Sequence, residues 1–244
     1  LAPQGAERIL RNIYAEGYTE PSIVQGLGIP ALISRRDALI QSKSGTGKTN
    51  TFLCGTLIHF QQENPQLQYI YVSCTREVAR QIYEVMMGYL PAGTKTALCV
   101  GRGKNPGEQV PSLAEQIAAA RQAQVICCTM GKFYDLYERG IIDTRALKAI
   151  CVDEWDAIIS GRAHEGELST GEQIQTIIEE LDSHVQRIFV SATISEYSQH
   201  RALALFRARA LHVPLPFVMM LPEQDLTLDG IRQYYTIETR NHYL

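Results

Sequence analysis

The chain has 244 residues, 45% of them hydrophobic, and carries 23 Lys and Arg against 26 Asp and Glu, for a formal net charge of -3. This length and apolar content suffice for one substantial globular core. The small negative charge excludes the overall positive field that binds nucleic acid non-specifically, so any nucleic-acid site must be local. No apolar run approaches the roughly 20 residues that cross a bilayer, and the first residues lack a signal-peptide pattern. We therefore expect a folded cytoplasmic protein with no membrane partner.

Short apolar runs alternate along the chain with longer segments of helical spacing. Strands are expected at 37–41, 68–73, 95–100, 124–129, 149–152 and 186–190. Helices are expected at 49–61, 76–90, 112–121, 132–139, 171–181 and 195–207. This alternation predicts the α/β class: a mostly parallel, twisted sheet with helices on both faces and ligands beyond the carboxyl ends of the strands.

The pattern changes after Val213, where Pro214, Pro216 and Pro222 punctuate an extended stretch. Apolar and polar residues then alternate over 228–239, as in another strand. We expect one domain over 1–220, a linker over 221–230, and the start of a second domain over 231–244. That second domain cannot close a core within so few residues, so we expect the natural chain to continue beyond Leu244.

Most of the six cysteines lie within or beside the strand-like runs, and none of their spacings gives a CxxC or Cys/His zinc pattern. They are Cys54, Cys74, Cys99, Cys127, Cys128 and Cys151. Free cysteine packs as a small hydrophobic residue, so we expect buried thiols in a reducing compartment and no metal or redox role.

A glycine-rich loop follows the first strand and opens a helix, which is the setting of a phosphate-binding P-loop. Gly45 and Gly47 let backbone N–H groups curl around phosphate oxygens at the positive end of the helix. Lys48 would reach the β and γ phosphates, and the Thr49 hydroxyl would ligate Mg²⁺. The expected nucleotide-binding residues here are Ser44, Gly45, Thr46, Gly47, Lys48 and Thr49. The alternative is a glycine-rich turn without a ligand.

Three acids lie at the end of another predicted strand, directly after the apolar run 149–152. The four residues there are Asp153, Glu154, Trp155 and Asp156. Asp153 suits Mg²⁺ binding, and Glu154 suits the general base that orients water for attack on the γ phosphate. A solvated acidic turn is the alternative. Downstream of a P-loop, the acids favour ATP hydrolysis with Lys48, Asp153 and Glu154 as the catalytic residues.

Small hydroxyls follow the strand 186–190, at Ser191 and Thr193 on either side of Ala192. They would lie at a further strand end beside the phosphate site. An ordinary helix N-cap remains an equal alternative for this pair.

With these three motifs in this order, the chain resembles the first RecA-like domain of DEAD-box RNA helicases over almost its whole length. Residues 17–25 look like the Q motif of that family, which implies that Gln25 binds the adenine edge and Tyr18 stacks on the ring, selecting ATP over GTP. Tyr18 could instead be an aromatic side chain packed in a loop. The resemblance further implies that Asp156, Ser191 and Thr193 couple the nucleotide site to RNA.

Residues similar to the family's RNA-gripping elements follow other predicted strands. They are Thr75, Arg76, Gly101, Arg102, Thr129, Gly131 and Lys132. Strand ends and helix starts can hold a sugar-phosphate backbone without reading bases. Taken singly, Arg76 or Lys132 could be a solvated surface charge.

Several positions depart from the family pattern. Ser42 stands where the loop usually begins with Ala, Cys74 and Met130 each replace a Pro, Arg102 replaces a Gly, and Lys132 replaces an Arg. Trp155 replaces the Ala of the acidic motif and needs either room or a polar partner for its indole N–H.

Two segments, 10–15 and 226–235, are similar to the translation initiation factor 4A group of the family. This similarity implies messenger RNA as substrate and a translation-initiation scaffold protein as partner. The leading hypothesis is an RNA-dependent ATPase and helicase in which ATP closes two RecA-like domains on single-stranded RNA. The alternatives are a nucleotide-gated binding module with little catalysis, and a DNA-directed helicase or another P-loop ATPase. Because the family's arginine fingers belong to the second domain, this chain alone should hydrolyse ATP poorly.

Overall fold

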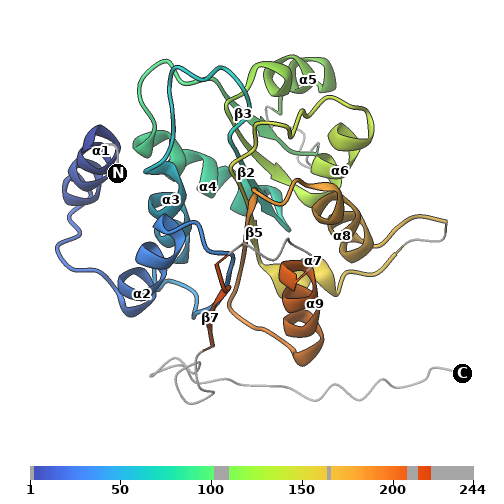
Figure 1. Ribbon diagram of the computed structural model, residues 1–244. Helices are drawn as coiled ribbons and strands as arrows, with labels where there is room; N and C mark the ends of the chain where they lie inside the picture. The colour runs from blue at the N-terminus through green and yellow to red at the C-terminus, as the bar shows by residue number, and fades with distance from the viewer. Residues whose placement is uncertain (1–2, 102–109, 164–165, 208–213, 221–244) are drawn as a thin grey trace, which may run out of the picture.

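One seven-stranded sheet organises the computed structural model, which describes residues 3–101, 110–163, 166–207 and 214–220 (Figure 1). Its strands are β1 (Ala38–Gln41), β2 (Tyr69–Ser73), β3 (Thr96–Cys99), β4 (Val125–Thr129), β5 (Ala149–Asp153), β6 (Gln186–Ser191) and β7 (Phe217–Met219). Their spatial order is β3-β4-β2-β5-β6-β1-β7, and every neighbouring pair is parallel. All the strands therefore end at the same edge of the sheet.

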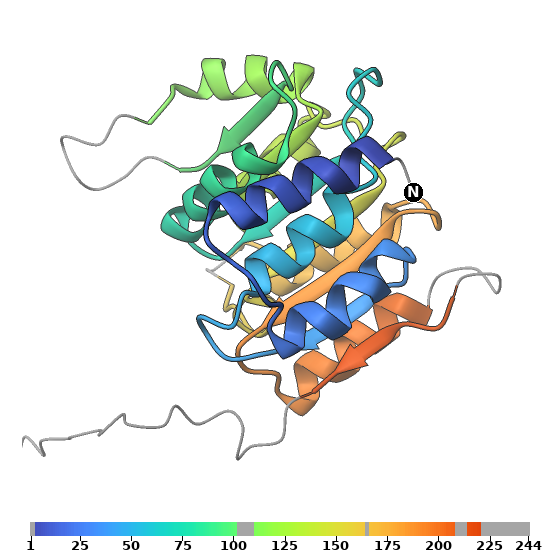
Figure 2. The ribbon, with the colours of Figure 1, turned by 90° about the vertical axis from the view of Figure 1, so that its left-hand side faces the viewer.

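Helices cover both faces of this sheet (Figures 1 and 2). They are α1 (Pro3–Ala15), α2 (Ile23–Ile33), α3 (Lys48–Leu57), α4 (Arg76–Tyr89), α5 (Leu113–Gln122), α6 (Met130–Glu138), α7 (Trp155–Ile159), α8 (Thr170–Glu180) and α9 (Glu196–Arg207). Figure 2 shows α1, α2 and α3 side by side over one face. Side chains of α5 to α9 form the core on the other.

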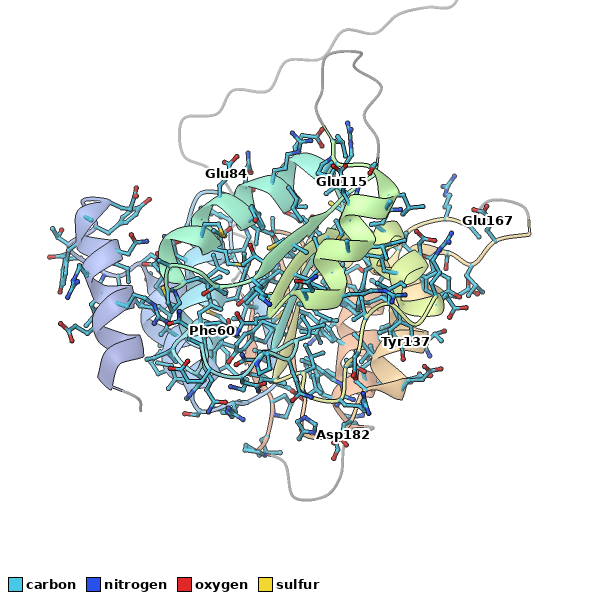
Figure 3. All side chains as sticks on the ribbon, turned by 90° about the horizontal axis from the view of Figure 1, so that it is seen from above. Phe60, Glu84, Glu115, Tyr137, Glu167 and Asp182 are labelled. Carbon is cyan, nitrogen blue, oxygen red and sulfur yellow. The ribbon has the colours of Figure 1, made fainter. Side chains whose placement is uncertain are left out.

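Alternation along the strands separates two apolar cores. In β2, Tyr69 and Tyr71 pack with helices α1 to α4, whereas Ile70 and Val72 pack with α5 to α9. Successive strand side chains point to opposite faces, so both cores draw on every central strand. Seen from above, Phe60 and Tyr137 lie on opposite sides of the sheet (Figure 3).

The predicted fold class and all six predicted strands are confirmed, with no strand end shifted by more than one residue. Strand β7, which pairs with β1, was not predicted. Neither were helices α1, α2 and α7. No helix among the described residues is long and apolar enough to cross a membrane. The predicted linker 221–230 and the predicted second-domain start 231–244 lie outside the described residues.

Five of the six thiols are buried, as expected, but Cys74 is exposed. It lies just beyond β2, where the chain leaves the sheet, so the apolar run that precedes it does not shelter it. Burial raises the pKa of Cys54 and of Cys99 to about 11, which keeps these thiols protonated and unreactive.

Candidate nucleotide and RNA site

Three neighbouring strands deliver the predicted nucleotide residues to one place. The loop 42–47 follows β1, Asp153 ends β5, and Ser191 ends β6, with β6 lying between the other two. The register pairs Gln41 with Ser191, and Asp153 with Val190. The P-loop, the acids and the hydroxyls are therefore neighbours at the carboxyl edge of the sheet, where open α/β sheets bind ligands.

The P-loop has a backbone that requires glycine. Gly45 and Gly47 have φ angles of 80° and 90°, which side-chain-bearing residues rarely adopt, and Gly47 caps the start of α3. The Lys48 ammonium group is buried and donates to the carbonyl oxygens of Ser42 (2.7 Å) and Lys43 (2.8 Å). These bonds close the loop around the lysine, so its charge lies within the turn of backbone that would cradle phosphates.

The segment that resembles the Q motif packs directly on this loop. Ser22 caps α2 and donates its hydroxyl hydrogen to the Thr46 carbonyl oxygen (2.7 Å). The Gln25 side chain accepts from the Ser22 N–H (2.9 Å), and its amide nitrogen lies so close to Gly47 that a Cβ there would collide with it. The capping box thus fixes Gln25 against the phosphate loop.

Tyr18 and Gln25 line one pocket together with Asn50 of α3 and with Leu10 and Ile13 of α1. The pocket lining is mostly apolar, and Tyr18 is half exposed. An aromatic face beside a side-chain amide is the combination that a purine base needs for stacking and edge recognition. Sequence reasoning missed Asn50 and the α1 residues because helical spacing alone does not reveal which pocket a helix faces.

The acids carry an electrostatic conflict. Asp153 is 6% exposed, and burial together with the neighbouring Glu154 charge raises its pKa to about 6. The Glu154 N–H (3.0 Å) and Lys48 partly oppose this shift. Burial lowers the pKa of Lys48, against the attraction of both acids. A buried carboxylate beside a second acid and a lysine fits a divalent cation, because the cation would neutralise the charge that burial penalises. The oxygen ligands Asp153 and Thr49 suit Mg²⁺.

The predicted coupling residues contact the acids. Ser191 donates to the Glu154 carboxylate (3.3 Å), and Thr193 donates to the Asp156 carboxylate (3.4 Å). Sequence reasoning missed Ser195, which donates to Asp156 through its N–H (3.1 Å) and its hydroxyl (2.7 Å). Burial opposes ionisation of Asp156, but these hydrogen bonds outweigh it and lower its pKa. The acidic turn, residues 153–156, is therefore hydrogen-bonded through both Glu154 and Asp156 to the end of β6 and the residues just beyond it.

The other half of the sheet carries the predicted RNA residues, after β2, β3 and β4. Arg76, Gly101, Thr129 and Gly131 line one hollow of about 450 Å³. Ala157 and Ile158 of α7 also line it. The hollow therefore adjoins the short helix that begins immediately after Glu154.

Two further RNA candidates make local contacts, and one lies outside the described residues. Thr75 caps α4 by accepting from the Val78 N–H (3.2 Å). Lys132 pairs with Asp135 (3.0 Å). Arg102 lies outside the described residues. Candidate nucleotide and RNA residues thus occupy adjacent halves of one edge, with the boundary between β2 and β5.

Known proteins are similar to this chain in sequence and in fold. The DEAD/DEAH box helicase family matches residues 22–201. The chain is 41% identical to the putative ATP-dependent RNA helicase R458 of Acanthamoeba polyphaga mimivirus, with 98% of this chain and 51% of that relative covered. It is 32% identical to the ATP-dependent RNA helicase eIF4A of Kluyveromyces lactis (97% and 55% covered) and 32% identical to the ATP-dependent RNA helicase FAL1 of Candida albicans (93% and 52% covered).

A structure of S. cerevisiae Dbp5 bound to RNA and ADP BeF3 has a TM-score of 0.74 and 27% identity, with 96% of this chain and 53% of that chain covered. The present chain thus spans about half the length of these relatives. Because the family match extends over most of the sequence, the chain belongs to the DEAD/DEAH box helicase family.

Proposed function

We propose that this chain is the ATP-binding half of an ATP-dependent RNA helicase. The observation that carries the proposal is the convergence of Lys48, Asp153 and Glu154 at the ends of β1 and β5, beside the hydroxyls at the end of β6. A protein that used this edge for docking alone would have no physical need for a buried lysine beside the buried Asp153 and the neighbouring Glu154. Relatives of twice this length named as RNA helicases support the same reading.

In the proposed reaction, Gln25 and Tyr18 hold adenine, while the P-loop N–H groups and Lys48 hold the triphosphate. Mg²⁺ held by Thr49 and Asp153 would neutralise phosphate charge. Glu154 accepts a proton from the water that attacks the γ phosphorus, and the bond from that phosphorus to the bridging oxygen breaks.

RNA would bind at the other half of the edge, on residues following β2, β3 and β4. Helix α7 would link that surface to the nucleotide, because it lines the hollow and begins directly after Glu154. The contacts of Ser191 and Thr193 with the acids add a second connection. We propose a domain over 1–220, a linker over 221–230, and a second RecA-like domain starting at 231. The second domain would supply positive charge that stabilises the γ phosphate in the transition state, so this chain alone should hydrolyse ATP slowly.

Within this function, we propose messenger RNA as substrate, a cytoplasmic role in translation initiation, and a scaffold partner from that process. The support is the similarity of segments 10–15 and 226–235 to the translation initiation factor 4A group, together with the eIF4A relative. A relative named FAL1 has the same 32% identity, so identity does not separate these roles. Replacement of a host's own eIF4A gene by the full-length gene provides the test, and failure to sustain protein synthesis would refute translation initiation.

The biochemical test compares ATP turnover with and without single-stranded RNA in three proteins: this chain, the chain extended through its second domain, and the extended chain with Glu154→Gln. We expect RNA-stimulated turnover in the extended wild type and a loss of roughly 10²- to 10⁴-fold in the variant, because a general base contributes that much. Equal stimulation by DNA of the same sequence would refute RNA specificity. ATP binding without turnover in any version would instead support a nucleotide-gated binding module.

A further inference from the structure

Trp155 stands between Glu154 and Asp156 in the sequence, and its side chain packs into the apolar core. The indole ring is fully buried and stacks on Phe189 of β6, with ring centroids 4.0 Å apart and an interplanar angle of 9°. Phe189 in turn stacks on Phe206 of α9 at 5.1 Å. The indole N–H donates to the Ser198 carbonyl oxygen of α9 (2.8 Å). A single side chain therefore joins α7, β6 and α9.

The neighbours of Trp155 face the proposed nucleotide and RNA surfaces. Glu154 contacts Ser191 and Asp156 contacts Thr193, whereas Ala157 and Ile158 line the hollow beside Arg76. Because α7 spans only Trp155–Ile159, any rotation at its first residue moves the acids and the wall of the hollow together. Trp155 is thus placed to fix both at once.

The backbone of Glu154 shows why such fixation is needed. Glu154 has φ 54° and ψ 48°, a left-handed conformation that non-glycine residues rarely adopt. Strained conformations persist where the surrounding structure over-determines them. The stacked and hydrogen-bonded ring of the next residue supplies that constraint, since an indole with two anchors leaves little freedom for the peptide between Glu154 and Trp155.

We propose that Trp155 is a positioning residue: it holds Glu154 in its left-handed conformation and fixes α7 relative to α9, so that the acidic turn and the RNA-side hollow move as one unit. This inference rests on the proposed catalytic role of Glu154. Direct contact with Phe189 sets the plane of the indole ring, and the hydrogen bond to Ser198 fixes its rotation.

The test uses the full-length protein with two variants that perturb the same stack. Trp155→Phe keeps an aromatic ring on Phe189 but removes the indole donor, whereas Phe206→Leu disturbs the far end of the stack and leaves the acidic turn untouched. Amide hydrogen exchange over 154–158 and 193–199 measures how firmly the backbone of these two segments is held. We expect at least tenfold faster exchange in Trp155→Phe than in Phe206→Leu at both segments.

Kinetics provides the second readout. We expect Trp155→Phe to lower kcat with RNA by about 10- to 100-fold, as misplacing a catalytic group by about 1 Å does, while KM for ATP changes less than about twofold. Phe206→Leu should keep kcat near the wild-type value. Equal exchange in the two variants, or equal loss of kcat, would overturn the positioning role. A wild type without RNA-stimulated turnover would refute the proposed function instead, and the exchange comparison would still decide the structural claim.

Discussion

A pair of glycines tests how the adenine segment is held against the P-loop helix. Gly55 of α3 faces Leu32 of α2, and a Cβ at Gly55 would lie 2.5 Å from the Leu32 Cβ and 2.9 Å from its Cδ1. Leu32 is fully buried and cannot swing away. Gly26, also within α2, is exposed, and a Cβ there would meet nothing within 4 Å. Both substitutions to alanine make the same chemical change in a helix.

The expected free-energy changes have opposite signs. Alanine in place of a helical glycine stabilises by roughly 0.4 to 1 kcal/mol. Gly26→Ala should therefore raise Tm by about 1 to 4 °C, at roughly 2 to 4 °C per kcal/mol for a chain of this size. In Gly55→Ala, overpacking costs about 1 to 3 kcal/mol and exceeds that gain, so Tm should fall.

Calorimetry and nucleotide binding together decide the matter. Because Gln25 is carried by α2, pushing α2 from α3 should also weaken binding of a non-hydrolysable ATP analogue in Gly55→Ala but not in Gly26→Ala. A Gly55→Ala protein as stable as Gly26→Ala would refute the tight packing of α2 on α3. A destabilised Gly55→Ala with unchanged ATP affinity would refute the link from that packing to Gln25.

Three further outcomes follow from the site. Asp153→Asn should stabilise the metal- and nucleotide-free protein by about 3 kcal/mol at pH 8 and by about half that at pH 5. The pKa of Asp153 is about 6 in the folded protein and 3.8 ordinarily, so ionised Asp153 destabilises the fold. This destabilisation grows as the pH rises from 3.8 to 6 and is then constant, so an equal Tm gain at both pH values would contradict the reasoning. Lys48→Met should weaken ATP binding at least tenfold by calorimetry, since a charge-assisted hydrogen bond contributes about 1.5 to 3 kcal/mol; unchanged affinity would count against the P-loop assignment. Ser195→Ala should destabilise by about 1 kcal/mol at neutral pH and less as acid protonates Asp156, whose pKa is lowered in the fold; chemical denaturation at pH 7 and pH 3 would show a constant loss if the reasoning were wrong.

Local sequence signals were sufficient for the central strands and for the placement of the nucleotide motifs. Strands β1, β5 and β6 are buried at every position and largely apolar, as strands covered on both faces are. Asp153 ends β5, Ser191 ends β6, and the P-loop follows β1 directly. Helix α2 gave no such signal, because it contains Pro30 and two glycines and lacks a polar face. It is stabilised by the Ser22 capping box and by contact with α3, which periodicity does not encode.

Tertiary partners were the part that sequence could not supply. The need of Trp155 for a polar partner follows from its chemistry, but Ser198 lies 43 positions away and belongs to another helix. Strand β7 spans three residues after Pro216, which is too short for an alternating pattern, and it forms by pairing with β1. The shared hollow of Arg76 and Gly131 likewise arises from the order of β2, β3 and β4 in space.

The strand order also governs when this domain can fold on the ribosome. The inner edge of β1 pairs with β6, and Asp37, just before β1, accepts from the Arg187 N–H, a contact spanning 150 residues. At synthesis rates of roughly 5 to 20 residues per second, β1 waits about 8 to 30 s for that partner to emerge. During this interval β1 and the P-loop that follows it lack the neighbouring strand β6. Pairing between strands so far apart in the sequence also slows folding. Nascent chains of this protein should therefore depend on chaperones until β6 has left the exit tunnel.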